Sequence, residues 1–121
     1  MPTHDWREVT EDLTAALRPL RSGAAEPMKA FSALARAALE PKALSLKTKE
    51  LIALAISVAT RCDACIAFHA EAAQRHGASR EEVMETMGMA IYMGAGPSVM
   101  YAAQALEAFD QFAAEREPET V

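Results

Sequence analysis

Helix-breaking residues divide this chain into segments of helical length, and this pattern constrains the fold more than any other feature. Proline or glycine occurs at Pro19, Pro41, Gly77 and within residues 94–97. Between these breaks the chain consists mainly of Ala, Leu, Glu, Met and Arg, which favour helices, and no strand pattern is present. The sequence therefore predicts an all-α fold of about six helices in one domain spanning residues 1–121.

Capping residues and prolines bound the expected helices. Ser45 is placed to cap the third helix, and an S-x-x-E capping box begins at Ser79, before the fifth. Pro27 suits the first turn of the second helix. We expect residues 20–25 to form a loop and residues 117–121 to fray. The six helices are predicted at residues 5–17, 27–39, 46–60, 62–77, 80–93 and 97–116.

Two apolar stretches stand out. Residues 51–59, in the third helix, are apolar apart from Ser57, which predicts the core helix. Residues 86–106 carry no charge and are long enough to span a bilayer. Glycine and proline at residues 94–97 divide this stretch into halves too short to span, so we expect two buried helix segments and no membrane partner.

The fifth predicted helix is apolar over most of its circumference. A helix of this kind must be buried, and a single small domain has few places to bury it. We hypothesise that it packs against another subunit; the alternative is a central helix within one subunit. Its apolar residues are Val83, Met84, Met87, Met89, Ala90, Ile91 and Met93.

Charge and composition exclude several classes of function. The net charge is −5 and no run of Lys or Arg occurs, so nucleic acid and anionic membranes are poor partners. The first residues lack a signal-peptide pattern, which predicts a cytoplasmic location. No flavin, haem or nucleotide motif is visible, and no glycine-rich phosphate loop precedes a helix, so we expect no cofactor.

The only two cysteines of the chain define the candidate site. Cys62 and Cys65 lie three residues apart, and His69 follows the second by four. In a helix these three residues fall within an arc of about 60° on one face. Cysteines in a reducing compartment are more often catalytic or metal-binding than structural, so this arrangement indicates redox thiol chemistry.

The dithiol has two features that favour a thiolate. It lies at a predicted helix N-terminus, and His69 can accept the thiol proton directly or through water. Glu50, on the helix before, can orient His69 if the two helices pack together; the alternative is an ordinary acidic residue in a solvated first turn. We expect Cys65 to attack a peroxide, Cys62 to form the disulfide, and an external dithiol to reduce it.

The alternative to redox chemistry is that this cluster binds a zinc ion. Cys62, Cys65 and His69 would leave one open position, which is a catalytic pattern. His76 cannot join them, because it lies about 21 Å along a helix from Cys62. We assign no metal to the site, and elemental analysis of protein purified without zinc tests this. His76 is expected to end its helix, and His4 to be a mobile terminal residue.

These motifs together resemble the alkylhydroperoxidase D and carboxymuconolactone decarboxylase-like superfamily, over residues 25–112. The resemblance rests on Glu50, the Cys62–Cys65 pair, His69 and the segment that begins at His76-Gly77. It implies a helical bundle that assembles into trimers or hexamers, with sites near subunit contacts. It also implies a thiol-dependent peroxidase in which the second cysteine attacks.

The chain departs from the alkylhydroperoxidase D pattern at Ala64, where those proteins carry a histidine. One part of their proton relay is therefore missing. Two other functions remain open: lactone decarboxylation or related acid–base chemistry in the same pocket, and a non-catalytic redox sensor. Activity that survives loss of both cysteines would indicate the first, and oxidation without repeated turnover the second.

Overall fold

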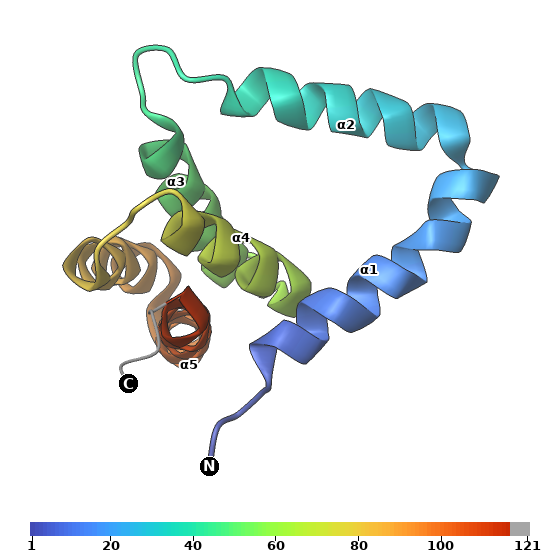
Figure 1. Ribbon diagram of the computed structural model, residues 1–121. Helices are drawn as coiled ribbons and strands as arrows, with labels where there is room; N and C mark the ends of the chain where they lie inside the picture. Colours follow the sequence, from blue (N-terminus) through green and yellow to red (C-terminus); the bar gives the residue numbers. More distant parts are fainter. Residues whose placement is uncertain (117–121) are drawn as a thin grey trace.

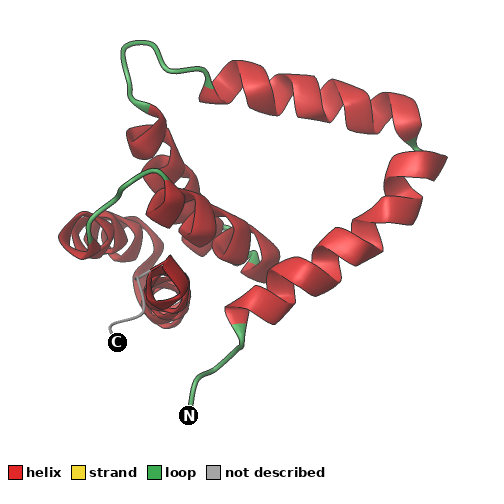
Figure 2. Cartoon of the chain, viewed as in Figure 1, coloured by secondary structure: helices red, strands yellow, loops and turns green. Residues whose placement is uncertain are grey.

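The computed structural model describes residues 1–116, so the predicted fraying of residues 117–121 lies outside the described part of the chain. The described residues form helices joined by short loops and contain no strand, which confirms the all-α prediction (Figures 1 and 2). The helices are α1 (Trp6–Gly23), α2 (Ala25–Leu39), α3 (Leu46–Ala59), α4 (Asp63–Arg75) and α5 (Arg80–Arg116).

The prediction of six helices was wrong, because the last two form one element, α5. The interruption between its two arms is confined to Ala95, which has a φ of 58° and a ψ of −149°. Gly94 permits the bend, since a Cβ at this position would collide with the buried side chain of Ser98. Arg80 and Asp110 then form an ion pair across the two arms, with Nε and Oδ1 3.0 Å apart.

The predicted end of the first helix and the loop at residues 20–25 were also wrong. Helix α1 continues through Pro19 to Gly23, and α2 begins at Ala25 instead of Pro27. Proline removes one backbone N–H but does not prevent the helix from continuing, and good helix formers lie on both sides of it. Only Ala24, with a φ of −118°, separates the two helices.

The predicted caps of α3 and α5 were confirmed. The Ser45 hydroxyl accepts a hydrogen bond from the backbone N–H of Thr48 at 3.1 Å. The Ser79 N–H donates to Glu82 at 2.8 Å, and the Glu82 N–H donates back to the Ser79 hydroxyl at 3.1 Å. The Ser79 N–H and a contact with Lys47 hold the pKa of the Glu82 carboxyl below its usual value.

The core lies where α3, α4 and α5 pack against one another. Leu54 and Val58 of α3 are fully buried, but Ile52 and Ile56 on the same helix are exposed. The predicted core helix is therefore buried on one face only. Within the described residues, no helix is long and apolar enough to cross a membrane.

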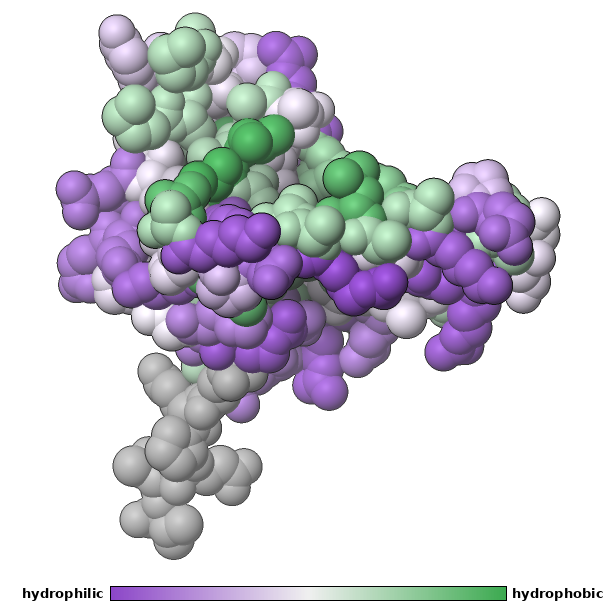
Figure 3. Space-filling view, turned by 90° about the horizontal axis from the view of Figure 1, so that it is seen from above, coloured by the Kyte–Doolittle hydropathy of each residue, from purple (hydrophilic) through white to green (hydrophobic). Residues whose placement is uncertain are grey.

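Helix α2 stands apart from this core. It has no buried residue, and it contacts only its neighbours in the chain, α1 and α3. In Figure 1 these two contacts leave α2 as one side of an open triangle, with α1 and the α3–α4 pair as the others. Figure 3, which looks down on this side, shows hydrophobic surface exposed between hydrophilic residues.

The N-terminal segment is fastened to α5, about one hundred residues away. The Trp6 side chain is fully buried, and its indole N–H donates to Glu107 at 2.9 Å. The same carboxylate accepts from the backbone N–H groups of Thr3 and His4. Burial alone would raise the pKa of Glu107, but the hydrogen bonds from Thr3, Trp6 and His4 outweigh burial and lower it.

We expect Glu107→Gln to destabilise the fold at pH 7 by about 2 kcal/mol, because a charged acceptor of several hydrogen bonds is lost. The folded pKa lies below the unfolded one, so this stabilisation is complete above the unfolded pKa of about 4.3 and is lost as pH falls through the folded pKa. Urea unfolding at pH 7 and below pH 4 measures the difference. Glu85→Gln, an exposed change on α5, is the control, and an equal deficit at both pH values would contradict the expectation.

Candidate active site

Cys62 occupies the junction between α3 and α4 and is held by the ends of both helices. Its backbone N–H donates to the Ser57 carbonyl at 3.1 Å, and the Arg61 N–H donates to the Val58 carbonyl at 3.1 Å. These two bonds form a Schellman motif at the end of α3, with Arg61 in the left-handed region at a φ of 58°. Backbone hydrogen bonds alone thus fix the position of Cys62, without any contact of its side chain.

The Cys62 side chain is the N-cap of α4. Its Sγ accepts a hydrogen bond from the backbone N–H of Cys65 at 3.1 Å, and the two sulfur atoms form a disulfide. Both cysteines are partly buried. After reduction, the same backbone N–H and the dipole of α4 would stabilise a thiolate at Cys62.

His69 lies one turn after Cys65 on α4, and its ring contacts Glu50 of α3. His69 Nδ1 and Glu50 Oε2 are 2.8 Å apart, and the side chains are 34% and 5% exposed. A nearly buried carboxylate needs such a partner, because an unpaired charge in this position would be costly. The contact orients the imidazole and leaves its other nitrogen for a proton of a substrate or thiol.

The structure therefore brings together Glu50 with His69 and Cys62 with Cys65, all within the packed α3–α4 pair. A thiol pair, an imidazole and an orienting carboxylate can carry out redox exchange coupled to proton transfer. Within residues 1–116, no three side chains of His, Cys, Asp or Glu converge closely enough to hold a metal ion. His76, which was excluded above as a fourth zinc ligand, is the C-cap of α4 at the opposite end of the helix.

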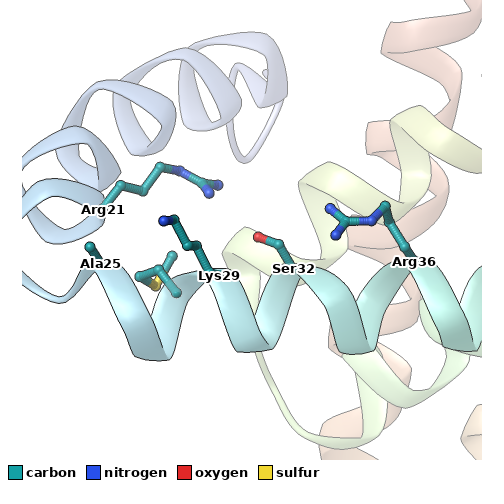
Figure 4. Close-up of a pocket in the computed structure, with 6 residues that line it drawn as sticks. Arg21, Ala25, Lys29, Ser32 and Arg36 are labelled. Atoms are coloured by element: carbon teal, nitrogen blue, oxygen red, sulfur yellow. The ribbon is translucent and has the colours of Figure 1, made fainter.

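A separate cavity lies along α2, away from these residues (Figure 4). Its volume is about 310 Å³, and its lining includes Arg21 of α1 together with Lys29, Ser32 and Arg36 of α2. The described ion pairs include none of these three cations. None of the predicted site residues contributes to this cavity.

The expectation that His4 is a mobile terminal residue was wrong. Its imidazole lies against the Trp6 ring, with centroids 4.6 Å apart, and its Nε2 is 3.8 Å from Asp63 Oδ2 at the start of α4. Its position depends on residues about one hundred positions away in α5, which spacing along the chain does not reveal. The only local signal was Asp5, which caps α1 and fixes the backbone beside His4.

Comparison with known proteins gives consistent findings. The sequence profile of the carboxymuconolactone decarboxylase family matches residues 25–108. A crystal structure of an apo carboxymuconolactone decarboxylase family protein from Legionella pneumophila is similar, with a TM-score of 0.87 and 51% identity over 89% of this chain and 96% of that one. An uncharacterized protein from Cupriavidus necator is 44% identical over 73% of this chain and 80% of its own length. Another, from Haemophilus influenzae, is 42% identical over 87% of this chain and 93% of its own.

Proposed function

Since this chain belongs to the carboxymuconolactone decarboxylase family, as its resemblance predicted, we propose that it is a thiol-dependent peroxidase of the alkylhydroperoxidase D type. The observation that carries the proposal is the Cys62–Cys65 disulfide at the start of the helix that also bears His69, with Glu50 bound to that imidazole. A sulfur pair that closes into a disulfide can cycle between two redox states. An oriented imidazole on the same helix can supply and accept the protons of that cycle.

The first step oxidises Cys65. Its thiolate attacks one oxygen of a hydroperoxide, so that an S–O bond forms and the O–O bond breaks. The departing alkoxide takes a proton from His69 and leaves as the alcohol, or as water when the substrate is hydrogen peroxide. Glu50 stabilises the imidazolium before this transfer and holds the ring in place afterwards. Cys65 is then a sulfenic acid.

The second step closes the disulfide. The Cys62 thiolate attacks the Cys65 sulfur, the S–O bond breaks, and hydroxide takes a proton and departs as water. The hydrogen bond from the Cys65 N–H to Cys62 Sγ favours the thiolate that this step needs. An external dithiol then reduces the disulfide by two thiol–disulfide exchanges and becomes oxidised itself.

Peroxide consumption with dithiothreitol or dihydrolipoamide as the reductant tests this proposal. We expect many peroxide molecules to be consumed per protein chain, and none above background by a variant in which both cysteines are serine. A single equivalent consumed per chain, with no further turnover, would indicate a redox sensor instead. Activity on a lactone substrate that survives in the double serine variant would support acid–base chemistry by Glu50 and His69, which contact each other without either sulfur.

We also propose that the functional unit is a homo-oligomer, a trimer or hexamer, located in the cytoplasm. Helix α2 has no buried residue, and large hydrophobic side chains are exposed on four helices, more than a monomer of this size usually exposes. The most exposed of these side chains are Phe31 and Leu34 of α2, Ile56 of α3, and Met89, Tyr92, Met93 and Met100 of α5.

Sedimentation velocity at micromolar concentration is expected to show at least three chains per particle. Phe31→Asp places a charge on a side chain that is 64% exposed in the single chain, and we expect it to weaken assembly at least about tenfold. Ala33→Asp, on the opposite side of α2, is the matched control. A wild-type monomer at this concentration would contradict the proposal.

A further inference from the structure

The N-terminal segment places a second imidazole, that of His4, near the start of α4, which is the helix end that carries the dithiol. We propose that His4 is a positioning residue for this dithiol: by holding its ring against Asp63, it limits how strongly the Asp63 carboxylate opposes a thiolate at Cys62. This inference rests on the proposed thiol chemistry. It concerns a residue that lies outside residues 25–108, the part of the chain that the family profile matches.

His4 is held in place by five contacts. Its ring Nδ1 lies 3.3 Å from the Thr3 hydroxyl and 3.5 Å from Gln104 Nε2. Its backbone N–H donates to Glu107 at 3.3 Å, and its carbonyl accepts from the Gln111 side chain at 2.8 Å. Its ring packs on the fully buried Trp6. These contacts aim Nε2 at Asp63 Oδ2, 3.8 Å away, yet the His4 and Asp63 side chains remain 33% and 50% exposed. The imidazole is therefore positioned but still open to protonation from solvent.

The effect on sulfur follows from charge. Asp63 is the first residue of α4 and directly follows Cys62, so its carboxylate opposes a second negative charge at that helix end. A protonated His4 offsets this carboxylate, and histidine titrates near neutral pH. Two further charged residues adjoin this pair: Arg61 directly precedes Cys62 in the chain, and Glu107 accepts a hydrogen bond from the His4 backbone.

Glu107 does not titrate near neutral pH. Its hydrogen bonds outweigh the effect of its burial and lower its pKa, so the carboxylate stays charged at neutral pH. His69 lies further along α4, and its contact with Glu50 of α3 is present in all the variants compared. A change with pH that depends on His4 can thus be assigned to its own ring.

The rate at which iodoacetamide alkylates the reduced protein reports the thiolate directly. Mass spectrometry measures this rate at Cys62. At pH 6 we expect His4→Gln to lower this rate about threefold, the size that a half-exposed ion pair supplies. At pH 8 the two rates should converge. His76→Gln, at the far end of α4, is the control and should match the wild type at both values.

An Asp63→Asn background separates the proposed role from simple packing. There we expect Cys62 to react faster than in the wild type, and His4→Gln to have little further effect. An equal threefold effect in both backgrounds would show that His4 acts without Asp63 and would overturn the proposal, as would a deficit that is the same at pH 6 and pH 8. Because alkylation needs no peroxide, the result is independent of whether the peroxide assay shows turnover.

Discussion

Cys65→Ser is expected to abolish peroxide turnover, down to the background of the variant that lacks both cysteines. The reason is chemical: without the Cys65 sulfur, no thiolate lies one turn before His69 to receive the peroxide oxygen. Cys62→Ser should behave differently. It retains the attacking sulfur, so without added thiol it should consume about one equivalent of peroxide and then stall, because the chain then has no second thiol to displace water from the sulfenic acid.

Single-turnover measurements with stoichiometric peroxide distinguish the two variants. The stalled Cys62→Ser protein should carry a sulfenic acid that a dimedone probe traps at Cys65, and excess peroxide should oxidise it further. Unfolding in urea provides the control for folding, since both substitutions are close in volume to cysteine. If Cys65→Ser consumed one equivalent and Cys62→Ser none, the roles of the two sulfurs would be reversed.

Local chemistry made much of the fold predictable from sequence. The capping serines, Ser45 and Ser79, act on the backbone within three residues, and both helix starts were predicted correctly. The break near Ala95 was also predicted, since glycines flank it and Pro97 follows. Pro19 gave the wrong answer because a missing N–H weakens a helix without ending it. The number of helices was wrong for another reason: the non-helical backbone is confined to Ala95, so the two arms form one element, α5.

Contacts between distant parts of the chain were the least predictable. Glu50 lies 19 residues before His69, and their contact required α3 and α4 to pack with these two faces together. The sequence spacing of Cys62, Cys65 and His69 predicted that they share one helix face. That spacing carried no information about His4. That residue depends on Glu107 and Gln111, whose roles follow only from the way α5 folds back across the N-terminus.

Glu50→Gln is expected to lower peroxide turnover by about two orders of magnitude, the lower end of what general acid–base catalysis contributes. Glutamine keeps the shape of the side chain and can still accept a hydrogen bond from His69 Nδ1. It cannot stabilise the imidazolium that forms when His69 takes the thiol proton, so the charge is the property removed. His69→Gln removes the proton carrier itself and should cause at least as large a loss.

The double variant tests whether Glu50 acts through His69. Residues that work as a unit give losses that do not add, so Glu50→Gln should cost almost nothing further once His69 is glutamine. Glu71→Gln, on α4 but paired with Arg75 at the surface, is the matched control and should retain wild-type turnover. Turnover of Glu50→Gln within about twofold of the wild type would show that this nearly buried carboxylate takes no part in proton transfer.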